Sequence, residues 1–303
     1  MRTYTGRILS LALAFAALSS ALAQAQNLFV SFAGNNSILE FTPSGVQSTF
    51  IHWGAQWAEA LAFNSAGDLF ASFPPNGGTI INGTIIEVTP GGAQSVFASG
   101  MSWPAGLAFN NAGDLFVADI LTGNSGNIYE FTPGGVRSTF ASGLSGCWGL
   151  AFNRAGNLFV ANNYSGSITE ITPGGVQSTF ATGLSSPVGL AFDSAGNLFV
   201  ACPGSGTIIK ITPGGAQSTF ASGLNAPQYL AFNGAGDLFE SDANSGKIYE
   251  FTPDGVRSTF ASGAGPMGLA FQGQTLPVPE PSALGLLAVG AAVLLVHRRR
   301  KSV

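Results

Sequence analysis

Residues 187–201 read Pro-Val-Gly-Leu-Ala-Phe-Asp-Ser-Ala-Gly-Asn-Leu-Phe-Val-Ala, and variants of this stretch recur along most of the chain. Its Leu-Ala-Phe centre begins at six positions, namely Leu61, Leu107, Leu150, Leu190, Leu230 and Leu269. A second phrase, T-P-x-G-x-x-S-T/V-F, begins at Thr42, Thr89, Thr132, Thr172, Thr212 and Thr252, and its last four copies step by 40 residues. A repeat of about 40 residues made of short strands and turns is typical of a β-propeller, in which each copy supplies one blade.

One repeat contains four predicted strands. In the copy that starts at residue 190, we expect strands over Leu190–Phe192, Leu198–Ala201, Thr207–Ile211 and Ala216–Ala221. The segment Asp193–Asn197 between the first two is a tight turn, because Gly adopts positive φ and Asp or Asn bonds back to the backbone. Each repeat therefore predicts one four-stranded antiparallel blade.

The order of the strands predicts that the two ends of the chain close the ring. Each strand type occurs six times, but the chain enters at a second strand, 28–31, and ends with a first strand, 269–271. The first blade therefore takes its inner strand from the far end of the chain, which removes exposed sheet edges. The predicted fold is all-β, one closed six-bladed β-propeller of 24 strands over residues 26–274.

The N-terminus has the composition of a secretory signal peptide. Two Arg residues precede an apolar run over 8–22, and two A-x-A sites follow within 21–25. Basic residues, an apolar stretch and a small-residue cleavage site in that order mark a segment that is removed on export. We expect residues 1–25 to be this signal, with the mature chain starting near Gln24 or Gln26.

The C-terminal segment 275–303 has the layout of a sorting signal. It contains the motif Val278, Pro279, Glu280 and Pro281, then an apolar helix over about 283–296, and then a basic tail over 297–301 with Arg298, Arg299 and Arg300. This order resembles the PEP-CTERM signal, which implies a bacterial surface protein whose tail is read and cleaved by an exosortase in the membrane. The basic tail predicts that the propeller lies outside the cell, held by the apolar helix at least until processing. A plain tail anchor is the alternative.

The charge of the predicted propeller excludes one class of partner. Between residues 27 and 276 there are five basic and fourteen acidic residues, which gives a net charge of −9. An exported domain with that charge is a poor nucleic-acid binder, because it repels phosphate. We therefore expect no nucleic-acid partner.

The repeats resemble the NHL, streptogramin-lyase and gluconolactonase-like propellers. The resemblance is carried by the stretch 187–201 and by I-T-E-I-T-P-G-G over 168–175, and it covers residues 27–271. It implies the six-bladed fold. It says much less about activity, since propellers host many functions.

Loop lengths distinguish the two faces of the predicted ring. The spacing from the Leu of Leu-Ala-Phe to the next strand's Leu is eight residues in all five complete repeats, and the spacing from the Thr of T-P to the Phe of S-T/V-F is eight in all six. We call the side formed by these two turns the fixed-turn face. On the opposite side, the variable-loop face, the spacing from that second Leu to the Thr is 14, 17 or 20 residues. Insertions on one face of a repeat protein often mark the binding face.

Aromatic residues predict a binding role for the variable-loop face. The four Trp residues and two of the Tyr residues are expected in its loops, namely Trp53, Trp57, Trp103, Trp148, Tyr164 and Tyr229. Such side chains offer apolar area and a polar group to a sugar or an apolar ligand. The alternative is that the Trp residues pack between blades. A ligand is expected between the loop 74–84 and Trp103 or Trp148.

Candidate oxygen ligands are few. Lactonases among the similar propellers bind a divalent metal through carboxylates and amides near the first strands. Of the six matching positions in this chain, only those of Glu59 and Gln228 carry a side chain that could ligate a metal. Asp119, Asn162 and Asp242 could add oxygens on the same face. A hard cation needs about six oxygens, so no metal and no other cofactor is predicted, and a cation at the channel mouth remains an alternative.

No catalytic set can be assembled from the sequence. Resemblance to streptogramin lyases implies a His general base, but the chain has only His52, in a loop, and His297, in the tail. Neither forms a Ser-His-Asp or Cys-His arrangement. Three hypotheses follow: a surface-displayed, non-catalytic propeller that binds extracellular polysaccharide or an envelope protein; a metal-dependent lactonase or lyase-like enzyme; and a structural matrix protein.

The two cysteines form a candidate disulfide. Cys147 and Cys202 are both expected on the variable-loop face of neighbouring blades, and export permits a bridge. A bridge needs Cα atoms within about 7 Å. Two separate buried thiols are the alternative.

Overall fold

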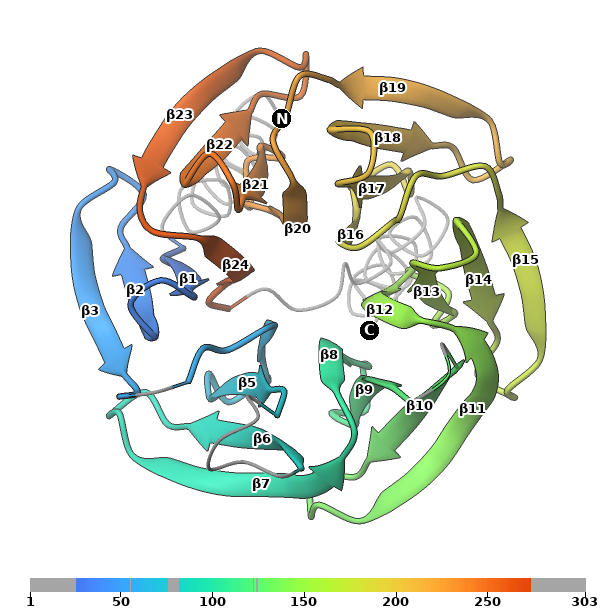
Figure 1. The fold of residues 1–303 in the computed structure, drawn as a ribbon, viewed down its shortest axis with the longest axis horizontal. Coiled ribbons are helices and arrows are strands. Elements are labelled where there is room, and N and C mark those ends of the chain that lie inside the picture. Colours follow the sequence, from blue (N-terminus) through green and yellow to red (C-terminus); the bar gives the residue numbers. More distant parts are fainter. Residues whose placement is uncertain (1–25, 55, 76–81, 122, 124, 274–303) are drawn as a thin grey trace, which may run out of the picture.

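Within the described part of the chain, 24 β-strands form six four-stranded antiparallel sheets that surround one axis (Figure 1). The computed structural model describes residues 26–273 except 55, 76–81, 122 and 124. The expected signal peptide, most of the insertion in the loop 74–84, the sorting motif and the C-terminal helix lie outside the described residues. The structure confirms the all-β, six-bladed propeller.

Each blade runs from an innermost to an outermost strand. The first blade comprises β24 (Pro266–Phe271), β1 (Leu28–Phe32), β2 (Ser37–Phe41) and β3 (Gln47–His52). The second comprises β4 (Leu61–Phe63), β5 (Leu69–Phe73), β6 (Gly83–Val88) and β7 (Gln94–Met101). The third comprises β8 (Pro104–Phe109), β9 (Leu115–Ile120), β10 (Ser125–Phe131) and β11 (Arg137–Ser145). The fourth comprises β12 (Cys147–Phe152), β13 (Leu158–Asn162), β14 (Ser167–Ile171) and β15 (Gln177–Ala181). The fifth comprises β16 (Leu190–Phe192), β17 (Leu198–Cys202), β18 (Thr207–Ile211) and β19 (Gln217–Ala221). The sixth comprises β20 (Pro227–Phe232), β21 (Leu238–Asp242), β22 (Lys247–Phe251) and β23 (Arg257–Ser262).

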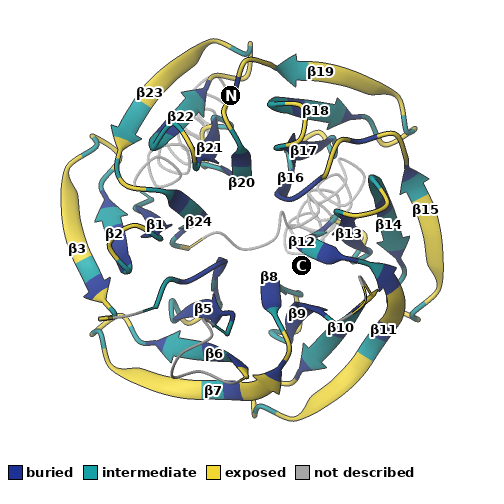
Figure 2. Cartoon of the chain, in the orientation of Figure 1, coloured by how far each residue is buried: buried dark blue, intermediate teal, exposed yellow. Residues whose placement is uncertain are grey.

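The two ends of the described chain join in the first blade, as predicted. Strand β24 pairs antiparallel with β1, with Phe271 opposite Leu28 and Leu269 opposite Val30. The backbone N–H of Gln272 then donates to the carbonyl oxygen of Asn27 at 3.0 Å. The ring is thus closed by main-chain hydrogen bonds. The residues of the inner strands are mostly buried, whereas the outer strands at the rim are mostly exposed (Figure 2).

The inner strands converge toward the variable-loop face. The residue before Leu-Ala-Phe is glycine in four of the six repeats, and a Cβ on Gly149 would collide with the carbonyl oxygen of Val188 in the next blade. Gly106 and Gly189 meet the backbone of the next blade in the same way. Glycine is required where two backbones approach this closely. The channel of the propeller is therefore narrow at that end.

Three phenylalanine rings pack against one another at every junction between blades. A Phe of each second strand makes edge-to-face contacts with the Phe of its own outer strand and with the Phe of the next blade's Leu-Ala-Phe, at centroid distances of 4.9–5.1 Å. The central Phe residues are Phe29, Phe70, Phe116, Phe159, Phe199 and Phe239. Six such trios use 18 of the 24 Phe residues in the chain. Edge-to-face pairs contribute about 0.5–1.5 kcal/mol beyond their buried area.

We expect Phe159→Ala to lower the free energy of unfolding by about 3–5 kcal/mol, because it removes the central ring of a trio and leaves a cavity. Phe159 is 3% exposed and contacts both Phe180 and Phe192. Urea unfolding followed by fluorescence measures the change. Val176→Ala is the matched control, since Val176 is 67% exposed on the rim and surface changes stay within about 0.5 kcal/mol. Equal effects of the two substitutions would contradict the role given to the trio.

One junction contains a buried acid that the sequence analysis did not single out. Glu240 lies in β21, opposite Leu230 and Tyr249 on the neighbouring strands. It is fully buried, and neither carboxylate oxygen has a hydrogen-bond partner among the described residues. Burial raises the pKa of Glu240 well above its usual value; the charge of Asp242 raises it further and that of Arg257 opposes this. The corresponding residues of the other second strands are apolar: Val30, Ala71, Val117, Val160 and Val200.

We expect Glu240→Val to stabilise the fold by about 1–3 kcal/mol, because it removes an unpaired buried polar group. The gain should grow with pH. The raised pKa means that the folded state keeps its proton while the unfolded state loses it, so the wild type loses stability as pH rises from the unfolded pKa to the folded one. Urea midpoints of both proteins at about pH 4 and about pH 8 test this. If Glu240→Val stabilised the fold equally at the two pH values, the pKa of Glu240 would not be raised in the folded protein.

Candidate functional site

Three of the predicted residues meet across the centre of the ring. The hydroxyl of Tyr229 donates to Oε1 of Glu59 at 3.5 Å, and the indole Nε1 of Trp148 donates to the Tyr229 hydroxyl at 3.1 Å. These residues come from the second, fourth and sixth blades, so their contacts cross the axis. We call Glu59, Trp148 and Tyr229 the channel plug, because together they fill the narrow end of the channel.

Irregular pairing aims two of these side chains at the axis. Registers shift between Cys147 and Leu150 in β12, and between Pro227 and Leu230 in β20. Such bulges re-aim side chains next to functional positions. Trp148 and Tyr229 therefore belong to inner strands, and the expectation that they lie in loops between blades was wrong. Tyr229 also replaces the glycine that precedes Leu-Ala-Phe in four repeats.

The channel plug is a buried acid in contact with a phenol and an indole. Glu59 is 3% exposed, and burial raises its pKa, while hydrogen bonds with Trp57, Trp148 and Tyr229 oppose that shift. Burial and the charge of Glu59 both raise the pKa of the Tyr229 hydroxyl. Burial thus shifts both groups toward their protonated forms.

The other predicted oxygen ligands cap loops. The carboxylate of Asp119 accepts hydrogen bonds from the backbone N–H groups of Ser102, at 3.1 Å, and Trp103, at 2.6 Å. Asp242 accepts from the backbone of Asn225 at 2.6 Å and of Ser245 at 3.1 Å. Burial raises the pKa of Asp119, and these two backbone donors oppose the shift. Both acids tie a loop between blades to a second strand.

Asn162 and Gln228 are also held within their own blades. The Asn162 side chain donates to the Thr169 hydroxyl at 2.8 Å, and the Gln228 side chain donates to the carbonyl oxygen of Ala226 at 3.4 Å. The structure thus does not bring Asp119, Asn162 and Asp242 together. In the described part of the chain, no group of three or more His, Cys, Asp or Glu side chains could hold a metal ion.

The remaining aromatic residues differ in exposure and in their contacts. All four indoles are half-buried, neither enclosed between blades nor free in solvent. Trp53 is fixed by a 2.6 Å hydrogen bond to Gln94 and by an edge contact with Phe73. The Nε1 of Trp103 is buried without a partner among the described residues. Tyr164 is 51% exposed and its ring lies against Gly146.

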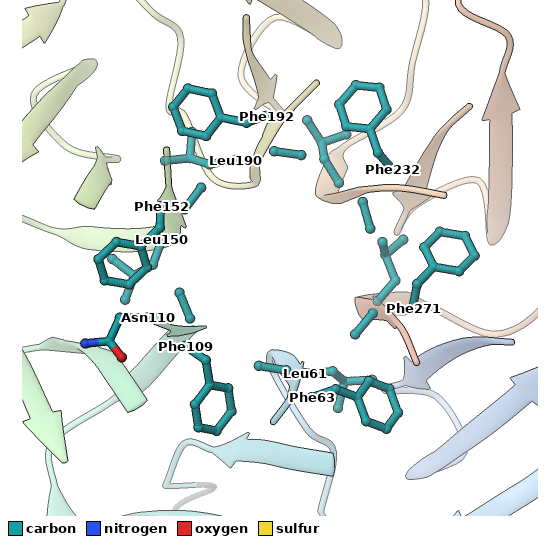
Figure 3. Close-up of a pocket in the computed structure, with 18 of the residues that line it drawn as sticks. Leu61, Phe63, Phe109, Asn110, Leu150, Phe152, Leu190, Phe192, Phe232 and Phe271 are labelled. Carbon is teal, nitrogen blue, oxygen red and sulfur yellow. The ribbon is translucent and has the colours of Figure 1, made fainter. Parts of the chain in front are cut away.

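A central cavity opens on the side of the ring opposite the channel plug. This cavity of about 330 Å³ is lined by the Leu-Ala-Phe segments of all six inner strands, with Ser65, Asn110 and Asn111 at its edge (Figure 3). Those three polar residues belong to the turns of the fixed-turn face. The labelled Phe rings point away from the centre into the blades, so aliphatic side chains and backbone face the open space. The sequence analysis did not predict this cavity, although the Leu-Ala-Phe repeat is its signal.

The two cysteines do not form the candidate disulfide in the structure. Both are free and buried. Cys147 begins β12, and its thiol donates to the carbonyl oxygen of Asn127 at 3.5 Å. The thiol of Cys202, at the end of β17, donates to the carbonyl oxygen of Val200 at 3.8 Å. Each thiol packs within its own blade junction, which keeps the sulfur atoms apart.

We expect both thiols to be free and unreactive in the native protein. Burial raises the pKa of Cys147 to about 12 and that of Cys202 to about 11, so almost no thiolate forms at neutral pH. A thiol reagent should label neither residue in the folded protein and both after denaturation without reductant. Fewer than two labelled thiols after denaturation would indicate a bridge and contradict the structure.

Comparison with known proteins agrees with this architecture of a six-bladed propeller followed by a sorting tail. Residues 277–301 match the PEP-CTERM protein-sorting motif. This motif implies processing by exosortase sorting machinery and export to the bacterial cell envelope. No curated protein matches the sequence significantly. Among the described residues, no helix is long and apolar enough to cross a membrane.

Solved structures with a similar fold include virginiamycin B and streptogramin B lyases. The chain is 18% identical to a catalytically inactive virginiamycin B lyase from Staphylococcus aureus with quinupristin. The match covers 82% of this chain and 93% of the lyase chain, with a TM-score of 0.59. A streptogramin B lyase structure is also 18% identical over 81% of this chain and 86% of its own, with a TM-score of 0.61. A protein of unknown function from Bacteroides caccae is 15% identical over 82% of this chain and 100% of its own, with a TM-score of 0.65. Identities this low show the fold alone.

Proposed function

We propose that this chain is an exported propeller, displayed at the cell surface, that binds a glycan or another envelope component on its variable-loop face without catalysing a reaction. The PEP-CTERM motif at 277–301 supports delivery to the envelope. In this proposal an exosortase cleaves near the motif, and the signal over residues 1–25 is removed during export. The tail segment holds the precursor in the membrane until then.

The observation that supports a non-catalytic role is that the acidic side chains on this face are held in hydrogen bonds within the fold. Asp119 and Asp242 each satisfy two backbone N–H groups of a loop. Glu59 is buried in the channel plug against Tyr229. Side chains engaged in this way are held by the fold, which supports a structural role for them over metal coordination or proton transfer. Carboxylates at these positions therefore have a structural role.

The aromatic residues supply the binding surface. Tyr164 is half exposed, and Trp57 and Trp103 are half-buried. The face is otherwise almost uncharged, because its acidic side chains are buried. Sugars stack their apolar C–H faces on such rings, and each stack contributes on the order of 1 kcal/mol. An uncharged aromatic surface of this kind suits a neutral polysaccharide.

The proposal is tested with extracellular polysaccharide prepared from the producing bacterium and with a glycan array. We expect Tyr164→Ala and Trp103→Ala each to weaken binding about fivefold, which corresponds to about 1 kcal/mol. Trp148 is unsuitable for this test, because it packs on the core and donates to Tyr229. Isothermal titration or surface plasmon resonance gives the affinities.

Two controls separate binding from folding. Val176→Ala changes an exposed side chain on the rim and should leave both affinity and melting temperature unchanged. Melting temperatures of the two aromatic variants should stay within about 4 °C of the wild type, the shift expected for 1 kcal/mol in a domain of this size. Unchanged polysaccharide affinity in both aromatic variants would refute the binding face.

A further inference from the structure

The central cavity differs at its two ends. Toward the variable-loop face, converging glycines and the channel plug narrow the channel. At the fixed-turn face it opens between turns that carry Ser65 and Asn110. Its walls are aliphatic side chains and backbone, and its volume of about 330 Å³ lies in the range of small ligand pockets. An apolar group entering from the fixed-turn face would contact the Leu and Ala side chains of the inner strands.

The charges of the propeller are concentrated on that same side. Ten acidic residues lie in or next to the turns of the fixed-turn face, and none is buried: Glu40, Asp68, Glu87, Asp114, Glu130, Glu170, Asp193, Asp237, Glu250 and Asp254. Four basic residues accompany them, which leaves a net charge of −6: Arg137, Arg154, Lys210 and Arg257. The other four acidic residues of the ring are all buried: Glu59, Asp119, Glu240 and Asp242. The negative potential therefore belongs to one face.

Two further clefts on this face combine apolar residues with acidic ones. One, of about 310 Å³ between the fourth and fifth blades, is lined by Phe159 and Phe192 and by the carboxylates of Glu170 and Asp193. Another, of about 240 Å³ at the closure of the ring, is lined by three Phe residues together with Asp237 and Glu250. Clefts away from the axis give contact points that a single small molecule in the central cavity would not reach.

We propose that the fixed-turn face binds a basic polypeptide segment that inserts one bulky apolar side chain into the central cavity. Charge complementarity selects this occupant. A second copy of the chain would present the same acidic face, and an anionic lipid surface would be repelled. The acidic side chains steer a basic segment toward the face, and the buried apolar anchor holds it there. This site is on the opposite side of the ring from the glycan surface.

The probe is a synthetic peptide with one Trp between two runs of three Lys residues. We expect it to bind the purified protein and the fluorescence of its Trp to shift to shorter wavelength. The fluorescence of the protein's own Trp residues is measured separately and subtracted. Raising the salt from about 0.05 M to about 0.5 M should weaken binding severalfold, because screening shortens the reach of the acidic groups. A peptide with Ser for Trp, and one with Ser for every Lys, should each bind at least tenfold more weakly.

Variants of the protein test the two parts of the site separately. The triple variant Asp68→Asn, Asp114→Asn and Asp237→Asn keeps the shape of three turns and removes three charges, and it should weaken binding of the Trp peptide at least fivefold. Ala151→Met narrows the central cavity and should weaken the Trp peptide while leaving the Ser peptide unchanged. If Ala151→Met fails to fold, the comparison of the Trp and Ser peptides on the wild type still decides the role of the cavity. Tyr164→Ala, on the opposite face, is the control and should bind normally.

Several results would overturn the proposal. Equal binding of the Trp and Ser peptides would show that the cavity takes no anchor, and unchanged binding by the triple variant would show that the acidic face is not involved. Self-association of the protein that Ala151→Met abolishes would assign the cavity to a second copy. Binding to neutral phosphatidylcholine vesicles in place of the peptide would assign it to a lipid. Loss of polysaccharide binding in Tyr164→Ala concerns the other face, so either proposal can fail without the other.

Discussion

The edge-to-face contact between phenylalanines of neighbouring blades is the interaction on which the rest of the propeller depends. A single four-stranded blade has two apolar faces and cannot bury either of them alone. The Phe of the second strand is therefore covered by a ring from its own outer strand and by one from the next blade, at nearly the same distance in all six junctions. Because each trio joins two repeats, every blade needs its neighbours, and only a closed circle satisfies all of them.

The taper of the blades toward the axis explains both ends of the channel. Space is smallest where the inner strands meet, so the sequence places Ala in the middle of Leu-Ala-Phe and Gly in front of it. At the variable-loop face the backbones touch, and the bulged strands β12 and β20 turn Trp148 and Tyr229 inward to meet Glu59. At the fixed-turn face the same strands diverge and leave a cavity. The narrow end and the open end follow from one geometry.

The sequence alone predicted the number of blades, the four strands in each and the closure by the last strand, because a repeat reports these directly. Loop lengths also assigned residues to faces. Repeats did not show which side chains bend toward the axis, since bulges in β12 and β20 depend on contacts between blades. Glu59 and Tyr229 are 170 positions apart and meet only when the ring closes. Glu240 stands out in the sequence as the one charged residue at a position that is otherwise Val or Ala, but the lack of a hydrogen-bond partner for its carboxylate is visible only in the structure.

The pairing of Gln272 with Asn27 has a mechanical consequence. The chain enters and leaves the ring at one point, on the fixed-turn face, and β24 is hydrogen-bonded only to β1. Any tension applied to the polypeptide beyond residue 273 therefore reaches the propeller through β24 and pulls along the one seam that joins the last strand to the first. Resistance of the ring to such a pull depends on the β1–β24 hydrogen bonds together with the Phe239–Phe271 contact beside them. Strand β24, which completes the first blade, is thus also the strand to which such a pulling force is applied.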